Sequence, residues 1–240
     1  MNVIVTGGSR GIGRGIVDEL AAEGCYNIGV IARSHTELKA LQKTLHKKGC
    51  ACYVEQCDIR NSDNVKAAFS ALISDLGGVD VLINNAGAII RNDIFSLSLD
   101  DWHAMQQTNV NGTFYAVRAV IPYMQKQRYG HIINISSISG RLPLAGGCGY
   151  AASKYAVTGF SESLFLEVRD YGIKVTTIFP GSVDTSFHKN DLREEDDTSW
   201  KITPADVGRC CHDVIDTSPN NCISRVEVRP LSRARQNRES

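Results

Sequence analysis

The sequence predicts an α/β fold in which a doubly wound parallel sheet of about seven strands is flanked by helices. Short apolar runs rich in Val and Ile alternate with longer amphipathic segments along the chain. A glycine-rich loop joins the first apolar run to the first amphipathic segment, and no internal repeat or linker interrupts the alternation. Strands and helices that alternate in this way are typical of a single domain built around a parallel sheet.

Each expected element has its own signal. Seven apolar runs have the composition of buried strands, at 2–6, 26–32, 51–56, 79–84, 130–136, 173–179 and 223–228. Helical spacing of apolar residues occupies 11–23, 35–48, 62–76, 100–127, 150–170 and 204–217. The last of these begins with Thr203 at the N-cap and Pro204 at the first helical position. We expect one domain over residues 1–230, an irregular polar segment at 184–202, and a flexible tail at 231–240.

Composition excludes several classes of partner. Lysine plus arginine and aspartate plus glutamate number 26 each, so the formal net charge is zero and gives no reason to expect nucleic acid or an anionic membrane. No stretch approaches the ~18–20 apolar residues of a membrane helix, and the N-terminus does not resemble a signal peptide. The eight cysteines include no CxxC pair, which disfavours a metal site. We expect a cytoplasmic protein with reduced thiols and no metal.

The loop after the first strand, "TGGSRGIGRG" at residues 6–15, is suited to holding a phosphate. Glycines there permit a tight turn, and a helix N-terminus offers free N–H groups and a positive dipole. The candidate cofactor-binding residues of this loop are Gly7, Ser9, Arg10, Gly11, Ile12 and Gly13. The loop lacks the Gly-Lys-Ser/Thr ending of nucleotide triphosphatases. It therefore favours a dinucleotide.

The residues after the second strand indicate which dinucleotide binds. An NAD site usually has a carboxylate there for the ribose 2′-hydroxyl, whereas this chain has Arg33 and Ser34 in "GVIARSH". Arg33 and Arg10 could instead bind a 2′-phosphate. We expect NADP(H) to be preferred over NAD(H), unless both arginines are only solvated surface charges.

A tyrosine and a lysine lie one helical turn apart in "YAASK", at Tyr150 and Lys154. The pair could be ordinary helix packing. It could also be a device that makes the phenol a working acid, because a nearby cation favours phenolate. The pair by itself does not decide between these alternatives.

Five motifs in order complete the pattern: "TGGSRGIG", "NNAG" (84–87), "SS" (136–137), "YAASK" (150–154) and "PG" (180–181). In this combination the chain resembles the short-chain dehydrogenase/reductase family, which has a Rossmann fold. The resemblance implies that Tyr150 is the general acid and base, and that Lys154 lowers its pKa and holds the nicotinamide ribose. It also implies that Ser137, rather than Ser136, binds the carbonyl oxygen. Asn109, rather than Asn111, is the counterpart of the family asparagine, which retains a water that links the lysine to solvent.

The same resemblance extends the expected cofactor site along the chain. Asp58 and Ile59 correspond to the adenine contact, and "NNAG" lines the cleft. The segment after the sixth strand orients the nicotinamide. The residues carried over are Asp58, Ile59, Asn85, Ala86, Gly87, Pro180, Gly181, Val183 and Thr185.

Substrate identity is the least determined feature. We expect a small ketone or aldehyde and its alcohol, contacted by Ser137, Leu142, Cys148 and Phe187, with 184–202 as a lid over the site. Two alternatives are 3-oxoacyl-[acyl-carrier-protein] reductase and a non-catalytic NADP-binding sensor. The family resemblance further implies a homotetramer or homodimer formed through the helices at 100–127 and 150–170.

Overall fold

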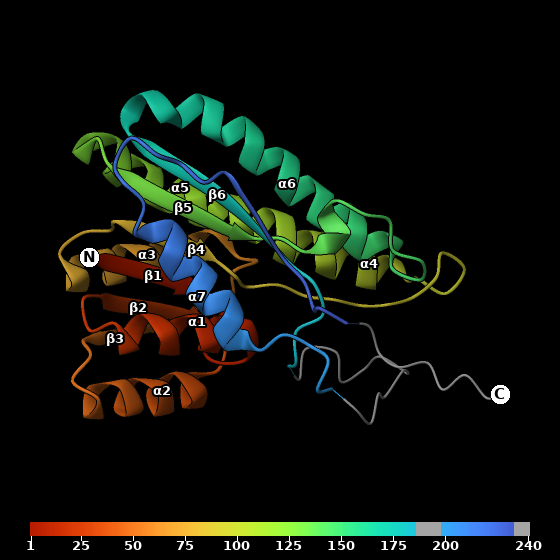
Figure 1. The fold of residues 1–240 in the computed structure, drawn as a ribbon, viewed down its shortest axis with the longest axis horizontal. Helices are drawn as coiled ribbons and strands as arrows, with labels where there is room; N and C mark the ends of the chain where they lie inside the picture. Colours follow the sequence, from red (N-terminus) through yellow and green to blue (C-terminus); the bar gives the residue numbers. More distant parts are fainter. Residues whose placement is uncertain (186–197, 233–240) are drawn as a thin grey trace.

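Seven strands form one sheet in the order β3-β2-β1-β4-β5-β6-β7, and every neighbouring pair is parallel (Figure 1). A computed structural model describes residues 1–185 and 198–232. The strands are β1 (Asn2–Thr6), β2 (Asn27–Ala32), β3 (Cys52–Gln56), β4 (Val81–Asn84), β5 (Gly130–Ile135), β6 (Ile173–Pro180) and β7 (Arg225–Val228). The strand order reverses direction between β1 and β4, and ligands bind beyond the carboxyl ends of strands at such a point. The expected doubly wound parallel fold is confirmed.

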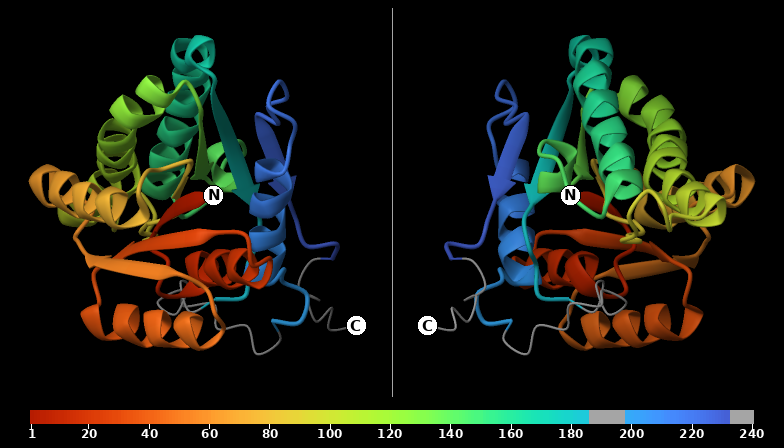
Figure 2. Two further views of the ribbon diagram at one scale, coloured as in Figure 1. Left: turned by 90° about the vertical axis from the view of Figure 1, so that its left-hand side faces the viewer. Right: turned by 90° about the vertical axis from the view of Figure 1, so that its right-hand side faces the viewer.

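Helices cover both faces of the sheet (Figure 2). They are α1 (Gly11–Ala22), α2 (His35–Lys47), α3 (Ser62–Leu76), α4 (Leu99–Met105), α5 (Gly112–Gln127), α6 (Cys148–Val168) and α7 (Pro204–Ile215). The apolar sides of α1, α2 and α7 share one buried cluster with Val3 and Val5, while those of α3, α5 and α6 share another with Ile4. Successive β1 side chains therefore enter opposite layers, as the period of a strand requires. Among the described helices, none has the length and apolar character needed to cross a membrane.

The helix expected at 100–127 is interrupted. A π-helical segment, η1 (Gln106–Asn111), separates α4 from α5. Each π turn accommodates an extra residue, which shifts the helix face relative to a regular α-helix. Asn109 is 1% exposed within this segment, whereas Asn111 donates to Gln107 at the surface.

The helix N-termini are stabilised unequally. Ser34 caps α2, Asn61 caps α3, and Thr203 forms a reciprocal capping box with Asp206 at α7. At α1 the N-cap residue is Arg10, and in the described structure no side chain caps that end. The first turn of α1 therefore keeps its N–H groups for another partner.

Two expectations extend beyond the described residues. The proposed lid at 184–202 lies mostly outside them, and Phe187 lies wholly outside. The expected tail at 231–240 is described only at its first two residues.

Candidate active site

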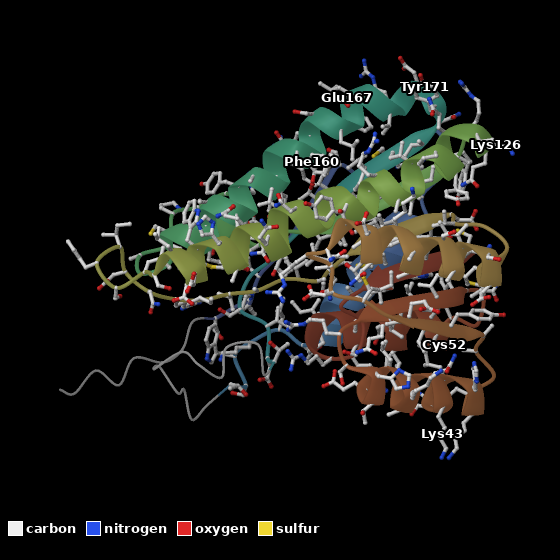
Figure 3. All side chains as sticks on the ribbon, turned by 180° about the vertical axis from the view of Figure 1, so that it is seen from behind. Lys43, Cys52, Lys126, Phe160, Glu167 and Tyr171 are labelled. Atoms are coloured by element: carbon white, nitrogen blue, oxygen red, sulfur yellow. The ribbon has the colours of Figure 1, made fainter. Side chains whose placement is uncertain are left out.

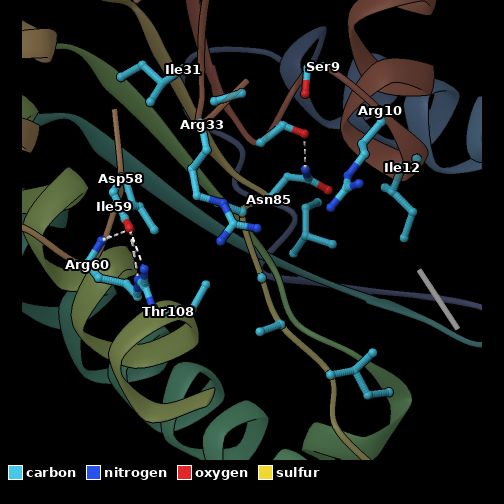
Figure 4. Close-up of a pocket in the computed structure, with 18 of the residues that line it drawn as sticks. Ser9, Arg10, Ile12, Ile31, Arg33, Asp58, Ile59, Arg60, Asn85 and Thr108 are labelled. Carbon is cyan, nitrogen blue, oxygen red and sulfur yellow. Dashed lines mark hydrogen bonds and ion pairs between the residues drawn. The ribbon is translucent and has the colours of Figure 1, made fainter. Parts of the chain in front are cut away.

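A cleft of about 1000 Å³ opens at the carboxyl end of the sheet, where β1, β2, β4 and β5 finish. Figure 4 shows Ser9, Arg10 and Ile12 on one side of it, with Arg33, Asp58 and Ile59 on the other. The expected site residues that line it are Gly7, Ser9, Arg10, Gly11, Ile12, Arg33, Ser34, Asp58, Ile59, Asn85, Ala86, Gly87, Tyr150, Lys154 and Thr185. Residues far apart in sequence thus share one cavity.

The phosphate loop is shaped by its glycines. Gly7 and Gly11 have φ angles of 67° and 56°, a left-handed conformation that side chains rarely adopt. Gly13 lies beneath the loop rather than on its surface, because a Cβ there would be 2.2 Å from the Gly7 carbonyl oxygen. Asn85 braces the same turn, since its Nδ2 donates to the carbonyl oxygens of Thr6 and Gly7 at 3.1 Å each. At Gly7 and Gly11 the loop therefore presents only backbone to a ligand, beside an uncapped helix end.

Two guanidinium groups project into the outer part of the cleft, from Arg10 and from Arg33 (Figure 4). Both side chains are exposed, and within residues 1–185 and 198–232 neither forms an ion pair. Ser34 lines the cleft and also has a structural role. Its hydroxyl accepts a hydrogen bond from the Glu37 N–H, which makes Ser34 the N-cap of α2.

Glu37 is a cleft residue that the sequence analysis missed. Its Oε2 accepts a hydrogen bond of 2.7 Å from the Ser9 hydroxyl, so it joins α2 to the phosphate loop. A signal was present, because Ser34 and Glu37 have the spacing of a capping box. That pattern predicts a carboxylate that returns to its own helix, whereas here it reaches the neighbouring loop.

The expected adenine contact, Asp58, is paired with Arg60. The Arg60 guanidinium donates to both carboxylate oxygens, at 3.0 Å from Nε and 2.6 Å from Nη2. These hydrogen bonds hold the pKa of Asp58 below its ordinary value, and the charge of Arg33 adds to the effect. Arg60 also lines the cleft and was not foreseen. Asp58 is therefore an ionised acceptor at this wall.

Tyr150 and Lys154 lie at the inner end of the cleft, where both are buried on α6. The Lys154 Nζ is 5.9 Å from the centre of the Tyr150 ring and donates to the Ile135 carbonyl oxygen at 2.9 Å. Burial lowers the pKa of Lys154 to about 8. The ammonium is thus still the main form at neutral pH.

The electrostatics of Tyr150 differ from the expectation. Burial is the largest effect, and it raises the pKa of the phenol above its ordinary value. A hydrogen bond with Ser137 and the positive charge of Arg91 oppose it and lower the pKa in part. The family resemblance implied that Lys154 lowers this pKa, whereas Arg91 is the cation that lowers it here. The direction has a physical cause, because desolvation of a buried phenol penalises its charged form.

Asn109 holds the loop that follows β4. Its Nδ2 donates to the Ala88 carbonyl oxygen at 2.9 Å and to the Ser153 hydroxyl at 2.8 Å, and its Oδ1 accepts from the Ala88 N–H at 2.7 Å. Ala88 directly follows the "NNAG" motif. The amide therefore ties η1 to the cleft wall and to α6. The water expected beside it stays a prediction.

The two adjacent serines have distinct surroundings. Ser136 donates its hydroxyl to the Lys154 carbonyl oxygen at 3.1 Å, which fixes β5 to α6. The Ser137 hydroxyl accepts from the Ser139 N–H at 3.1 Å and is hydrogen-bonded with Tyr150. Ser137 is therefore the serine that contacts the phenol, although Ser136, and not Ser137, lines the cleft within the described residues.

The remaining expected residues are less closely gathered. Pro180 ends β6, and the Gly181 N–H donates to the Val228 carbonyl oxygen at 2.7 Å. Val183 is buried and forms a bridge with Ile202. None of these three lines the cleft within the described residues, nor do the exposed Leu142 and Cys148.

Comparisons with known proteins agree with this geometry. The family model described as short chain dehydrogenase matches residues 1–196. An uncharacterized oxidoreductase of Staphylococcus saprophyticus is 31% identical over 240 residues, covering 97% of this chain and 96% of that protein. The 3-oxoacyl-[acyl-carrier-protein] reductase FabG of Staphylococcus aureus is 36% identical over 183 residues, covering 76% of this chain and 74% of its own.

A solved structure is similar over almost the whole length. The closed form of serine dehydrogenase complexed with NADP+ superposes with a TM-score of 0.89 and 31% identity, covering 99% of this chain and 98% of that one. The glycine loop and the Tyr150–Lys154 pair are among the motifs that carry the resemblance to this family. The chain belongs to the short-chain dehydrogenase family of oxidoreductases.

Proposed function

We propose that this chain is an NADP(H)-dependent oxidoreductase that interconverts a ketone or aldehyde and its alcohol, in a single catalytic domain over residues 1–230. The observation that carries the proposal is the buried Tyr150 beside Lys154 at the inner end of the cleft. A phenol in hydrogen-bond contact with a serine can pass a proton to a reacting oxygen. The positive charge of Arg91 favours the phenolate that remains.

The cleft suits a dinucleotide. The backbone of Gly7 and Gly11 and the uncapped end of α1 would bind the pyrophosphate, because N–H groups and the helix dipole favour anions there. Thr185 and the Asn85–Gly87 segment border the path from this loop to Tyr150. When bound, the cofactor supplies the hydride that reduces the carbonyl.

The chain's own groups manage the proton. Tyr150 donates its phenolic proton to the carbonyl oxygen as negative charge develops, and takes it back in the reverse direction. Ser137 orients the phenol and binds the same oxygen. Lys154, held by the Ile135 carbonyl, supplies the positive charge beside the phenol and is placed to bind the ribose.

Preference for NADP(H) is supported by Arg10 and Arg33, whose guanidinium groups face the outer cleft without an ion pair in the described part of the chain. The 31% identical serine dehydrogenase was solved with NADP+, which also supports it. The measurement is kcat/KM for NADPH and NADH. Arg33→Asp should move the preference toward NADH, and a wild-type preference for NADH would contradict the proposal.

A second candidate activity is reduction of 3-oxoacyl chains on acyl carrier protein. It is supported by the 36% identity to the Staphylococcus aureus reductase. Against it, Tyr171 occupies a position that the family resemblance leads us to expect to be basic in such enzymes. A free ketone or aldehyde therefore remains the first proposal.

One screen tests both activities. Loss of NADPH absorbance is followed with ketones, aldehydes, diketones, sugars and 3-oxoacyl thioesters, and Tyr150→Phe serves as the inactive control. Turnover with any class that disappears in the variant supports a carbonyl reductase and names its substrate class. Tight NADPH binding without turnover in every class would instead favour the non-catalytic sensor.

We further propose that two or four copies of the chain assemble through α5 and α6. Exposed apolar side chains on these helices support this, including Phe114 and Tyr155 at 45% exposure each and Leu166 at 61%. The ring of Phe114 is 6.2 Å from that of Phe160, a half-buried residue of α6 that Figure 3 labels. Sedimentation that finds only monomer at micromolar concentration would contradict it.

Cytoplasmic location is the remaining part of the proposal. It is supported by the eight cysteines, all of which have free thiols. Fluorescent tagging of the full chain in its host, checked by fractionation, measures the location. Recovery outside the cytoplasm would contradict it.

A further inference from the structure

A carboxylate lies inside the outer cleft, next to the two arginines proposed to bind a phosphate. Glu37 lines this space together with Ser9, Arg10 and Arg33, and its Oε2 is 2.7 Å from the Ser9 hydroxyl oxygen. Glu37 is half-buried on the first turn of α2, where the Ser34 cap fixes its backbone N–H. The carboxylate is thus held in place by both its own helix and the phosphate loop.

The hydrogen-bond chemistry of this pair has a direction. An ionised carboxylate only accepts hydrogen bonds, so the Ser9 hydroxyl must donate to Glu37. The Ser9 oxygen can then only accept from a ligand. A phosphate dianion has no proton to give, whereas a ribose hydroxyl does. Glu37 itself keeps lone pairs that can accept from the same ribose hydroxyl.

The charge acts in the same direction as the hydrogen bonds. A carboxylate in the space shared by Arg10 and Arg33 repels a 2′-phosphate and offsets part of their attraction. Asp58, whose carboxylate is paired with Arg60, has its charge already compensated. Within residues 1–185 and 198–232, the Glu37 carboxylate accepts a hydrogen bond only from the neutral Ser9 hydroxyl, so its charge reaches the cleft.

We propose that Glu37 is a specificity-determining residue that opposes the 2′-phosphate of NADP(H) and favours the unphosphorylated ribose of NAD(H). The inference rests on the proposed function, because it places a nicotinamide dinucleotide in this cleft. If Glu37 opposes the 2′-phosphate, the chain binds NAD(H) more tightly, relative to NADP(H), than Arg10 and Arg33 alone would allow. Removing the charge of Glu37 should sharpen discrimination in favour of NADP(H).

The test is calorimetric titration of the full chain with NADP+ and with NAD+, which measures binding without turnover. Glu37→Gln keeps an acceptor for Ser9 and removes the charge. It should raise the ratio of the NAD+ Kd to the NADP+ Kd about tenfold, the factor that corresponds to about 1.4 kcal/mol. Glu37→Ala removes both features and should raise the ratio at least as much. Glu167→Gln, on α6 away from the cleft, is the matched control and should leave it unchanged (Figure 3).

The outcomes separate this inference from the proposed cofactor preference. A ratio that stays the same or falls in both Glu37 variants, while NAD+ still binds, would overturn the assignment of Glu37. A wild-type chain that binds NAD+ more tightly would overturn the NADP(H) preference, yet a rise in the variants would still support Glu37. Failure of wild-type chain to bind either cofactor would overturn both.

Discussion

Asn109→Ala should destabilise the protein far more than Asn111→Ala, although the two residues share one π-helical segment. The Asn109 side chain makes three hydrogen bonds, two with Ala88 and one with Ser153. At about 1 kcal/mol for each bond, and with partial replacement by water at the half-buried Ala88, the loss is about 2–3 kcal/mol. Asn111 makes one exposed bond to Gln107, so its loss should stay within about 0.5 kcal/mol.

Thermal unfolding followed by circular dichroism measures the difference. A loss of about 2–3 kcal/mol in a chain of this size lowers Tm by about 4–12 °C. Alanine improves helix propensity by roughly 0.6 kcal/mol at both positions, so this gain cancels in the comparison. Equal Tm values for the two variants would refute the view that Asn109 braces the cleft wall.

Three further predictions concern the cleft. Tyr150→Phe should lower kcat by about 10²–10⁴-fold with NADPH binding retained, while the exposed Tyr155→Phe keeps its activity; equal activities would contradict the acid assignment. Burial lowers the pKa of Lys154 from 10.5 to about 8, so between these values the unfolded chain binds more protons and the free energy of unfolding rises with pH. Urea unfolding of Lys154→Met should lack this rise. Gly13→Ala places a Cβ 2.2 Å from the Gly7 carbonyl oxygen and should cost about 1–3 kcal/mol and weaken NADP+ binding, measured by unfolding and calorimetry.

Much of the fold could be predicted because a parallel sheet buried on both faces needs continuous apolar strands. The runs at 2–6 and 173–179 lie within or close to β1 and β6 for this reason. The interruption at η1 could not be predicted, because a π turn is a change in the hydrogen-bond pattern, and residues 106–111 contain no Gly or Pro that would mark a break in the helix.

The parts of the candidate site that consist of short motifs, such as "YAASK" and the glycine loop, could be predicted from the sequence. Contacts between residues far apart in the sequence could not be predicted. Ser9 and Glu37 are 28 positions apart, and no local pattern says that α2 brings them within a hydrogen bond. The pKa of Tyr150 was misassigned for a related reason, because it depends on how completely other elements enclose the phenol.

The uncapped end of α1 has a consequence for local folding equilibria. Where α2, α3 and α7 complete their first turns with side chains of the chain itself, α1 leaves that task to whatever anion binds the glycine loop. Its first turn should therefore open more readily in the free protein than the capped first turns of α2, α3 and α7. Binding would close it, because a ligand that prefers the closed form stabilises that form by mass action. Amide hydrogen exchange at the start of α1 would then report occupancy of the cleft directly, before any chemistry occurs.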